Sequence, residues 1–208
     1  MNVARILYPV EVLGPGKRVG IWVRGCIHHC KGCSNPELWN TVPEAEMTGQ
    51  QLINLILSSL DGRPVDGFIL TGGDPFFAPE ELLELLPLLR DISDDILVYT
   101  GYTYDELVQQ STPEIMNCLS MISVLIDGKY IEELNDGSII RGSSNQKIVF
   151  LDAEKRAKYE SYFAQIGNNR IQNFALSDGI VSVGIHSPNF KDELTKKAKE
   201  RGVLLDNK

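Results

Sequence analysis

The sequence predicts an α/β fold in which short, mostly parallel strands alternate with helices. Short apolar runs recur along the chain, amphipathic helical patterns separate most of them, and polar or glycine-rich residues follow several of the runs. Parallel strands need crossover connections, which are usually helices, so this order favours a parallel sheet. A β-hairpin and one further helix are expected to follow the sheet.

The composition is typical of one soluble globular domain. With 208 residues, of which 43% are hydrophobic, the chain is long enough for a single well-packed core. No apolar run approaches the roughly 20 residues of a membrane span, and no signal peptide is evident, so we expect a cytoplasmic protein without a membrane partner. The net charge of −8 argues against general nucleic-acid binding, because phosphate contacts need a basic surface.

The first predicted strand, residues 19–24, leads directly into a cysteine-rich loop. Cys26, Cys30 and Cys33 form a C-x3-C-x2-C pattern in this loop. Three thiols so closely spaced do not bridge one another comfortably, and they suit a metal or an iron–sulfur cluster. A cluster that needs four ligands and receives three keeps one iron open.

Two other interpretations of the loop remain. A structural zinc site would use the three thiolates and either His28 or His29, although such a site would be cramped. A disulfide framework is typical of small secreted chains, whereas this chain has four cysteines in 208 residues. The spacing favours the cluster over both.

The strand–loop–helix unit recurs after the cysteines. Thr48 opens a helical pattern that ends at residues 61–62, and a strand at residues 67–70 leads to a helix opened by Pro79. A strand at residues 96–99 then precedes a helix at residues 104–110. The chemistry of such a sheet is expected at the carboxyl ends of its strands.

Two further strands complete the predicted core, and a helix follows them. Strands are expected at residues 121–126 and 147–151, and a helix at residues 153–165. Cys118 lies in an apolar helical pattern and is interpreted as a buried thiol.

The C-terminal part has a different pattern. Residues 170–176 and 180–185 are β-rich and are separated by Ser177-Asp178-Gly179, a strong hairpin signal, and a last helix is expected at residues 189–201. This tail would be either a lid on the sheet or a sixth strand with an added partner. We expect a core at residues 1–151 and a helix–hairpin–helix extension at residues 152–208, packed on the core.

Several motifs identify a known family. The cysteine loop is followed by Gly72-Gly73-Asp74-Pro75 after the second strand, by Asp127-Gly128-Lys129 after the fourth, and by a polar loop from Arg141 to Gln146. This set resembles the radical S-adenosylmethionine (SAM) superfamily and, within it, the activating enzymes of anaerobic ribonucleotide reductases. Together with the alternation of strands and helices, the resemblance implies a partial (β/α)6-type barrel.

The resemblance also implies a function. An enzyme of this family holds a [4Fe–4S] cluster on Cys26, Cys30 and Cys33, cleaves SAM reductively, and forms a glycyl radical on a partner enzyme, here foremost an anaerobic ribonucleotide reductase. A flavodoxin- or ferredoxin-type protein would supply the electron. Two alternatives stay open: a radical SAM enzyme that modifies a peptide or small molecule, and a non-catalytic zinc- or cluster-binding module.

The turn after the second strand is the first candidate SAM-binding segment. Gly72 and Gly73 would let the backbone approach the methionine moiety closely, because no Cβ stands in the way. Asp74 would lie near the SAM amino group, with a helix cap as its simpler structural role. Because Gly32 stands where many superfamily members carry an aromatic residue, the adenine contact must come from elsewhere, such as the loop backbone or Ile27.

The later strand ends supply the remaining candidates. By the resemblance, Thr100, Asp127 and Lys129 would contact SAM, with Lys129 meeting its carboxylate and Asp127 orienting it or a bound cation. An ordinary Asp-Gly turn is an equally good interpretation of the Asp127 motif. Arg141 and Ser143 offer hydrogen-bond donors for a carboxylate or a ribose.

Overall fold

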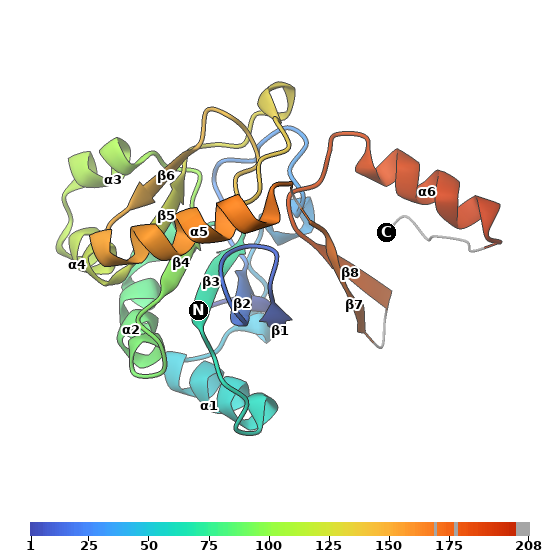
Figure 1. Ribbon diagram of the computed structural model, residues 1–208. Helices are drawn as coiled ribbons and strands as arrows, with labels where there is room; N and C mark the ends of the chain where they lie inside the picture. Colours follow the sequence, from blue (N-terminus) through green and yellow to red (C-terminus); the bar gives the residue numbers. More distant parts are fainter. Residues whose placement is uncertain (169, 177–178, 203–208) are drawn as a thin grey trace.

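Six strands form one mixed sheet whose spatial order follows the order of the chain (Figure 1). The structure is a computed structural model that describes residues 1–168, 170–176 and 179–202. The strands of the sheet are β1 (Val3–Val10), β2 (Arg18–Val23), β3 (Gly67–Gly72), β4 (Ile96–Tyr99), β5 (Val124–Asp127) and β6 (Lys147–Phe150). A mostly parallel α/β sheet is thereby confirmed, whereas closure into a partial barrel stays a prediction.

The two edge strands differ from the sequence-based expectation. Strands β2 to β5 are parallel, but β1 pairs antiparallel with β2, and β6 pairs antiparallel with β5. Mostly parallel strands were predicted without naming an exception, and β6 is antiparallel because residues 128–146 connect it to β5 through a loop with one 3-10 turn and no crossover helix. Strand β1 was not expected at all, because Arg5 and Pro9 interrupt its apolar pattern.

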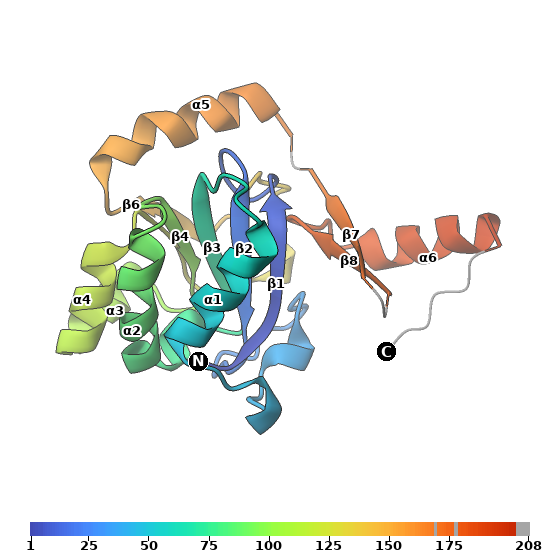
Figure 2. The same cartoon turned by 90° about the horizontal axis from the view of Figure 1, so that it is seen from below.

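Helices cover both faces of the sheet. One face carries α1 (Gly49–Leu60), α2 (Pro79–Arg90), α3 (Tyr104–Gln110) and α4 (Pro113–Met121), whose buried side chains join those of the strands in one core cluster. The opposite face carries α5 (Arg156–Ile166), which Figure 2 shows on the other side of the sheet from α1 and α2. The result is a three-layer arrangement with a core on each side of the sheet.

Local sequence explains where the main helices begin. Thr48 caps α1 because its side chain accepts a hydrogen bond from the Gln51 amide, and the Gln51 side-chain oxygen accepts one from the Thr48 amide. Thr103 and Glu106 form the same capping box at α3. These caps satisfy amide groups that have no partner within the helix, so both helices begin where the sequence predicts.

The C-terminal extension packs on the second face of the sheet. Tyr159 and Tyr162 of α5 are buried there, and the hairpin strands β7 (Gln172–Leu176) and β8 (Gly179–Val183) add Val183. The hairpin is a separate antiparallel pair and does not extend the main sheet. Residues 177 and 178 of the predicted turn, and residues 203–208 of the predicted extension, lie outside the described residues.

Helix α6 (Phe190–Glu200) extends away from the body of the protein in both views (Figures 1 and 2). Its charged side chains alternate with a narrow apolar stripe that contains Leu194, which is 42% exposed. Within the described part of the chain, no helix combines the length and the apolar character needed to cross a membrane.

A buried ion-pair cluster joins the extension to the amino-terminal ends of the strands. Arg18, at the start of β2, donates hydrogen bonds to the Asp95 carboxylate (2.8 Å) and to the Phe68 carbonyl (3.1 Å). Asp95 also accepts hydrogen bonds from Lys158 (2.6 Å) and Tyr159 (2.8 Å) of α5. The cluster therefore fastens α5 to the end of the sheet opposite to the cysteines.

Asp95→Asn is expected to lower the free energy of unfolding by about 3–5 kcal/mol at neutral pH, because it leaves the buried Arg18 guanidinium without its counter-charge. Burial by itself raises the pKa of Asp95, but Arg18, Lys158 and Tyr159 outweigh it and hold the pKa below its ordinary value of 3.8. The carboxylate thus adds stability that is fully present above pH 3.8 and is lost as the pH falls through the lower folded-state pKa.

Chemical denaturation from neutral to acidic pH measures this effect. Asp94→Asn is the matched control, since Asp94 pairs with Lys155 at 2.7 Å but has a 58% exposed side chain, and such surface pairs contribute about 1 kcal/mol or less. Equal losses in the two variants, or an unchanged acid response in Asp95→Asn, would contradict the assignment.

Candidate functional site

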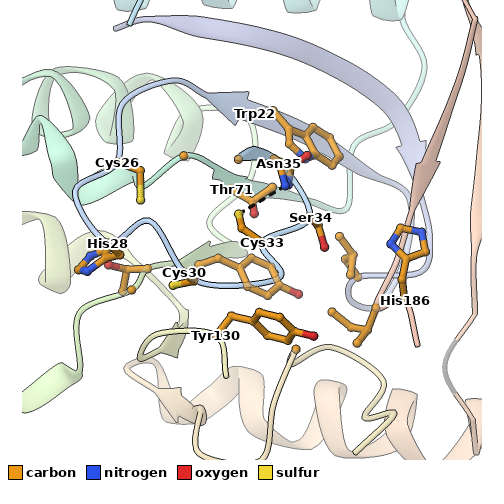
Figure 3. Close-up of a pocket in the computed structure, with 18 of the residues that line it drawn as sticks. Trp22, Cys26, His28, Cys30, Cys33, Ser34, Asn35, Thr71, Tyr130 and His186 are labelled. Carbon is orange, nitrogen blue, oxygen red and sulfur yellow. Dashed lines mark hydrogen bonds between the residues drawn. The ribbon is translucent and has the colours of Figure 1, made fainter. Parts of the chain in front are cut away.

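A cavity of about 230 Å³ opens at the carboxyl ends of β2 to β5. All three loop cysteines line it, together with the Thr71–Gly73 end of β3 and Thr100 after β4. Figure 3 shows Cys26 and His28 at one end of the hollow, and Tyr130 and His186 toward the other. The strand ends predicted to carry the chemistry therefore meet around one space.

The three loop thiols are partly buried and form no disulfide. Burial raises the pKa of the Cys26 thiol, while backbone hydrogen bonds from His28 and His29 act in the opposite direction. Burial likewise raises the pKa of Cys30, opposed by the Tyr130 amide and the Lys129 charge. Cluster ligands are thiolates, so metal binding must displace the thiol protons, and the amides are placed to stabilise the resulting thiolates.

The thiol arrangement fits a cluster better than a single ion. Among the described residues, no three cysteine, histidine or carboxylate side chains converge as the ligands of one metal ion. The thiolates of a [4Fe–4S] cluster each bind a different iron, so they need not converge on one point. Three thiols around one cavity, with amides directed at their sulfurs, match that requirement.

Asp74 is a buried hydrogen-bonding centre directly behind the cysteine loop. Its carboxylate accepts hydrogen bonds from the amides of Phe76 and Gly101, both at 2.9 Å, and from the Thr100 hydroxyl at 2.9 and 3.0 Å. The His28 Nε2 atom lies 2.8 Å from Asp74 Oδ2, a distance at which a protonated imidazole pairs with the carboxylate. Asp74 thus ties the β3 and β4 ends to the cysteine loop.

Comparison with known proteins agrees with this geometry. Residues 12–149 match the family described as "4Fe-4S single cluster domain". The chain is 38% identical over 151 residues to the anaerobic ribonucleoside-triphosphate reductase-activating protein of Escherichia coli (strain K12), covering 68% of this chain and 94% of the relative. This chain belongs to the family of anaerobic ribonucleoside-triphosphate reductase-activating proteins.

Two other members of the activating-protein family agree. The protein of the same name from Haemophilus influenzae is 40% identical over 151 residues, which covers 68% of this chain and 93% of the relative. That from Enterobacteria phage T4 is 35% identical over 153 residues, with 71% of this chain and 93% of the relative covered. The relatives are therefore matched over nearly their whole length by about two thirds of this chain.

Of the other residues predicted to contact SAM, some line the cavity and others hold the elements around it. Thr100 lines the cavity, whereas Lys129 is exposed, and its charge partly opposes the rise that burial causes in the pKa of Cys30. The Asp127 carboxylate accepts hydrogen bonds from the amides of Tyr104 (2.8 Å) and Lys147 (2.9 Å), so it caps α3 and holds the start of β6.

The polar loop before β6 is held mainly by contacts with the chain that connects it to β5. Arg141 pairs with Asp136 at 2.7 Å. The buried Ser143 hydroxyl accepts a hydrogen bond from the Ile131 amide at 3.1 Å. Of the loop's described residues, Gly142 and Gln146 line the cavity, and Gln146 also donates to the Gly128 carbonyl at 2.8 Å.

Several cavity residues were not predicted from the sequence. Tyr130 follows the Asp127-Gly128-Lys129 motif directly, so its position next to that motif was an available signal. Trp22 lies among apolar residues of β2, so the sequence does not distinguish it from a core residue, but in the structure it lines the cavity. Asn135 and His186 are brought to the cavity by tertiary contacts that no local pattern indicates.

The unassigned histidines and the fourth cysteine have structural positions. The His28 ring meets Tyr102 edge-on at 4.6 Å, and the exposed His29 ring stacks on Trp39 at 4.6 Å. Cys118 is fully buried in α4, and burial raises its pKa to about 12. The prediction of a buried Cys118 thiol is confirmed.

Gly73→Ala is expected to disturb the cysteine loop. A Cβ at Gly73 would lie 2.4 Å from the Gly25 carbonyl oxygen, so the backbone on either side must move. Overpacking of this kind costs about 1–3 kcal/mol, and we expect a lower melting temperature together with reduced iron incorporation after anaerobic reconstitution. Gly49→Ala is the control, because its Cβ would meet the flexible end of Leu88 at 3.1 Å. Normal iron incorporation in Gly73→Ala would show that the close approach is dispensable.

Proposed function

We propose that this chain is a radical SAM activating enzyme that forms a glycyl radical on a partner, an anaerobic ribonucleoside-triphosphate reductase. The observation that carries the proposal is the convergence of Cys26, Cys30 and Cys33 on the cavity that also receives the Gly72–Gly73 turn. Family membership supports it, since the relatives are named as activating proteins of that reductase.

The protein's first task is to hold the cluster and to tune it. Bound to three thiolates, a [4Fe–4S] cluster would present an open iron to SAM and deliver the electron that breaks a C–S bond, giving methionine and a 5′-deoxyadenosyl radical. The backbone amides of His28, His29, Tyr130 and Asn35 donate to the cysteine sulfurs. Such hydrogen bonds stabilise negative charge at sulfur and so help to set the reduction potential.

The second task is to place the methionine end of SAM beside the cysteines. Gly72, Gly73 and Thr100 line the cavity and would contact SAM directly, while the exposed Lys129 would attract its carboxylate. Asp74 would act mainly by holding Thr100 and the cysteine loop in place.

Three more candidates would act on loops that surround the cofactor. Asp127 holds the beginnings of α3 and β6, and Arg141 and Ser143 hold the loop before β6. Curvature of the sheet into a partial barrel would bring these strand ends around SAM.

The third task is to admit a donor and a partner. The cysteine loop lies at the protein surface, where Ile27 is 61% exposed and the Lys31 side chain is 78% exposed. A flavodoxin- or ferredoxin-type donor could therefore approach the cluster from outside, in a cytoplasmic, reducing environment.

Electron paramagnetic resonance after anaerobic reconstitution tests the proposal. The reconstituted protein, SAM, a strong reductant and the anaerobic ribonucleotide reductase are expected to give a glycine-centred radical signal that requires all four components. A reductase in which the radical-bearing glycine is replaced by alanine is the control. Formation of 5′-deoxyadenosine with no glycine radical would refute this partner and point to a peptide or small-molecule substrate.

A further inference from the structure

The C-terminal extension supplies one wall of the cavity. Residues 182–186, at the end of β8 and beyond it, line the same space as the cysteines. In Figure 3, His186 lies at the opposite end of the hollow from Cys26 and His28, and the Tyr130 side chain lies between these two ends. We call the end at His186 the aromatic end of the cavity.

Side chains hold this wall against the core from two directions. Gln172 of β7 donates to the Pro9 carbonyl at 2.7 Å and accepts from the Glu11 amide at 3.0 Å, which fixes the hairpin to the end of β1. Asn135 donates to the His186 carbonyl at 2.8 Å and to the Tyr130 hydroxyl at 3.2 Å. Asn135 thus joins the extension to the loop after β5 at the cavity itself.

The His186 ring is positioned by a neighbouring ring of the extension. Its centroid lies 4.1 Å from that of Phe190, with 32° between the ring planes. The lining of the same cavity also includes Trp22, Tyr130 and Asn135. Aromatic faces combined with amide and hydroxyl groups are what proteins use to hold a nucleobase by stacking and edge hydrogen bonds.

The relatives do not have the residues to build this wall in the same way. The family match ends at residue 149, and the Escherichia coli protein is 94% covered by an alignment that takes up 68% of this chain. A segment as long as residues 150–208 therefore has no counterpart of similar length in that relative. The aromatic end of the cavity is in part a feature of this chain.

We infer that the segment 182–186, chiefly His186, binds the adenosyl group of SAM while the methionine end lies at the cysteines. This inference rests on the proposed function, because it takes SAM as the ligand. It also replaces Ile27 as a candidate adenine contact, since Ile27 is 61% exposed and is outside the described lining of the cavity. His186 would stack on the base, and Asn135 would keep the wall in place.

Equilibrium binding of S-adenosylhomocysteine to the anaerobically reconstituted protein tests the inference. His186→Ala is expected to weaken binding about tenfold, the effect of losing one base–aromatic stack, while methionine binding and iron content stay unchanged. His186→Phe, which keeps an aromatic ring, is expected to bind within about twofold of the unaltered protein. Leu194→Ala, on the exposed face of α6, is the control and should bind normally.

Hydrogen exchange on the unaltered protein gives a second readout that does not depend on a variant folding. S-adenosylhomocysteine should slow amide exchange in residues 180–186, whereas methionine should not. The inference is overturned if His186→Ala binds S-adenosylhomocysteine normally or if the variant loses methionine binding to the same extent. It is also overturned if S-adenosylhomocysteine does not change amide exchange in this segment. Absence of a glycine radical on the reductase would overturn the proposed partner and leave these binding results standing.

Discussion

Cys30→Ala is expected to abolish stable cluster binding, because a cluster held by only three protein ligands would be left with two. Loss of a residue that only hydrogen-bonds to a metal ligand lowers metal affinity or activity by up to about a hundredfold. Loss of a ligand itself is therefore expected to lower cluster affinity further. Iron and sulfide analysis after anaerobic reconstitution, together with the visible absorption of the cluster, measures it. Cys26→Ala and Cys33→Ala should behave alike.

Cys118→Ala is the matched control for these variants. Cys118 is fully buried in α4, and its thiol lies 3.5 Å from the Pro79 carbonyl. Its replacement should leave iron content unchanged, with a modest loss of stability from the lost packing. Thiol titration of the metal-free protein should modify the three loop cysteines and spare Cys118. If Cys30→Ala retained full iron and sulfide, the cluster would have to be bound elsewhere.

Asp74→Ala is expected to lower the free energy of unfolding by several kcal/mol, because it leaves several buried donors without an acceptor and each such donor costs about 1–3 kcal/mol. The Thr100 hydroxyl, the amides of Phe76 and Gly101, and the His28 ring would lose their common partner. Because His28 belongs to the cysteine loop, iron incorporation should fall as well. Thermal unfolding and iron analysis of the same samples measure both effects.

Asp152→Ala is a closely matched control. Asp152 also caps a 3-10 helix by accepting a hydrogen bond from the amide two residues later, at 2.9 Å, but this contact is exposed to solvent. Loss of such a cap costs about 1 kcal/mol, and cluster content should not change. Similar losses in the two variants would mean that Asp74 is a simple cap.

The sequence was most informative where chemistry depends on local spacing. The cysteine triad, the Gly72–Gly73 turn and the order of strands and helices all lie in short contiguous patterns, and these predicted that the candidate residues gather at the carboxyl ends of the strands, where the cavity lies. The starts of the helices after Thr48 and Thr103 could also be predicted from the sequence, because capping is a local interaction.

Features that depend on distant contacts were beyond the sequence. The pairing of β1 with β2 and the antiparallel direction of β6 are decided by neighbours in the sheet. The Asp127 carboxylate, which is predicted to lie near SAM, accepts hydrogen bonds from backbone amides of two other elements, and the sequence did not indicate these contacts. His186 reaches the cavity only because Gln172 and Asn135 fix the extension to the core.

Product analysis under strong reductant tests the central claim, that three thiols hold a cluster with an iron open to SAM. The reconstituted protein alone is expected to convert SAM to 5′-deoxyadenosine and methionine in equal amounts, and Cys30→Ala should form neither. A protein with its full content of iron and sulfide that leaves SAM unconsumed would contradict the account.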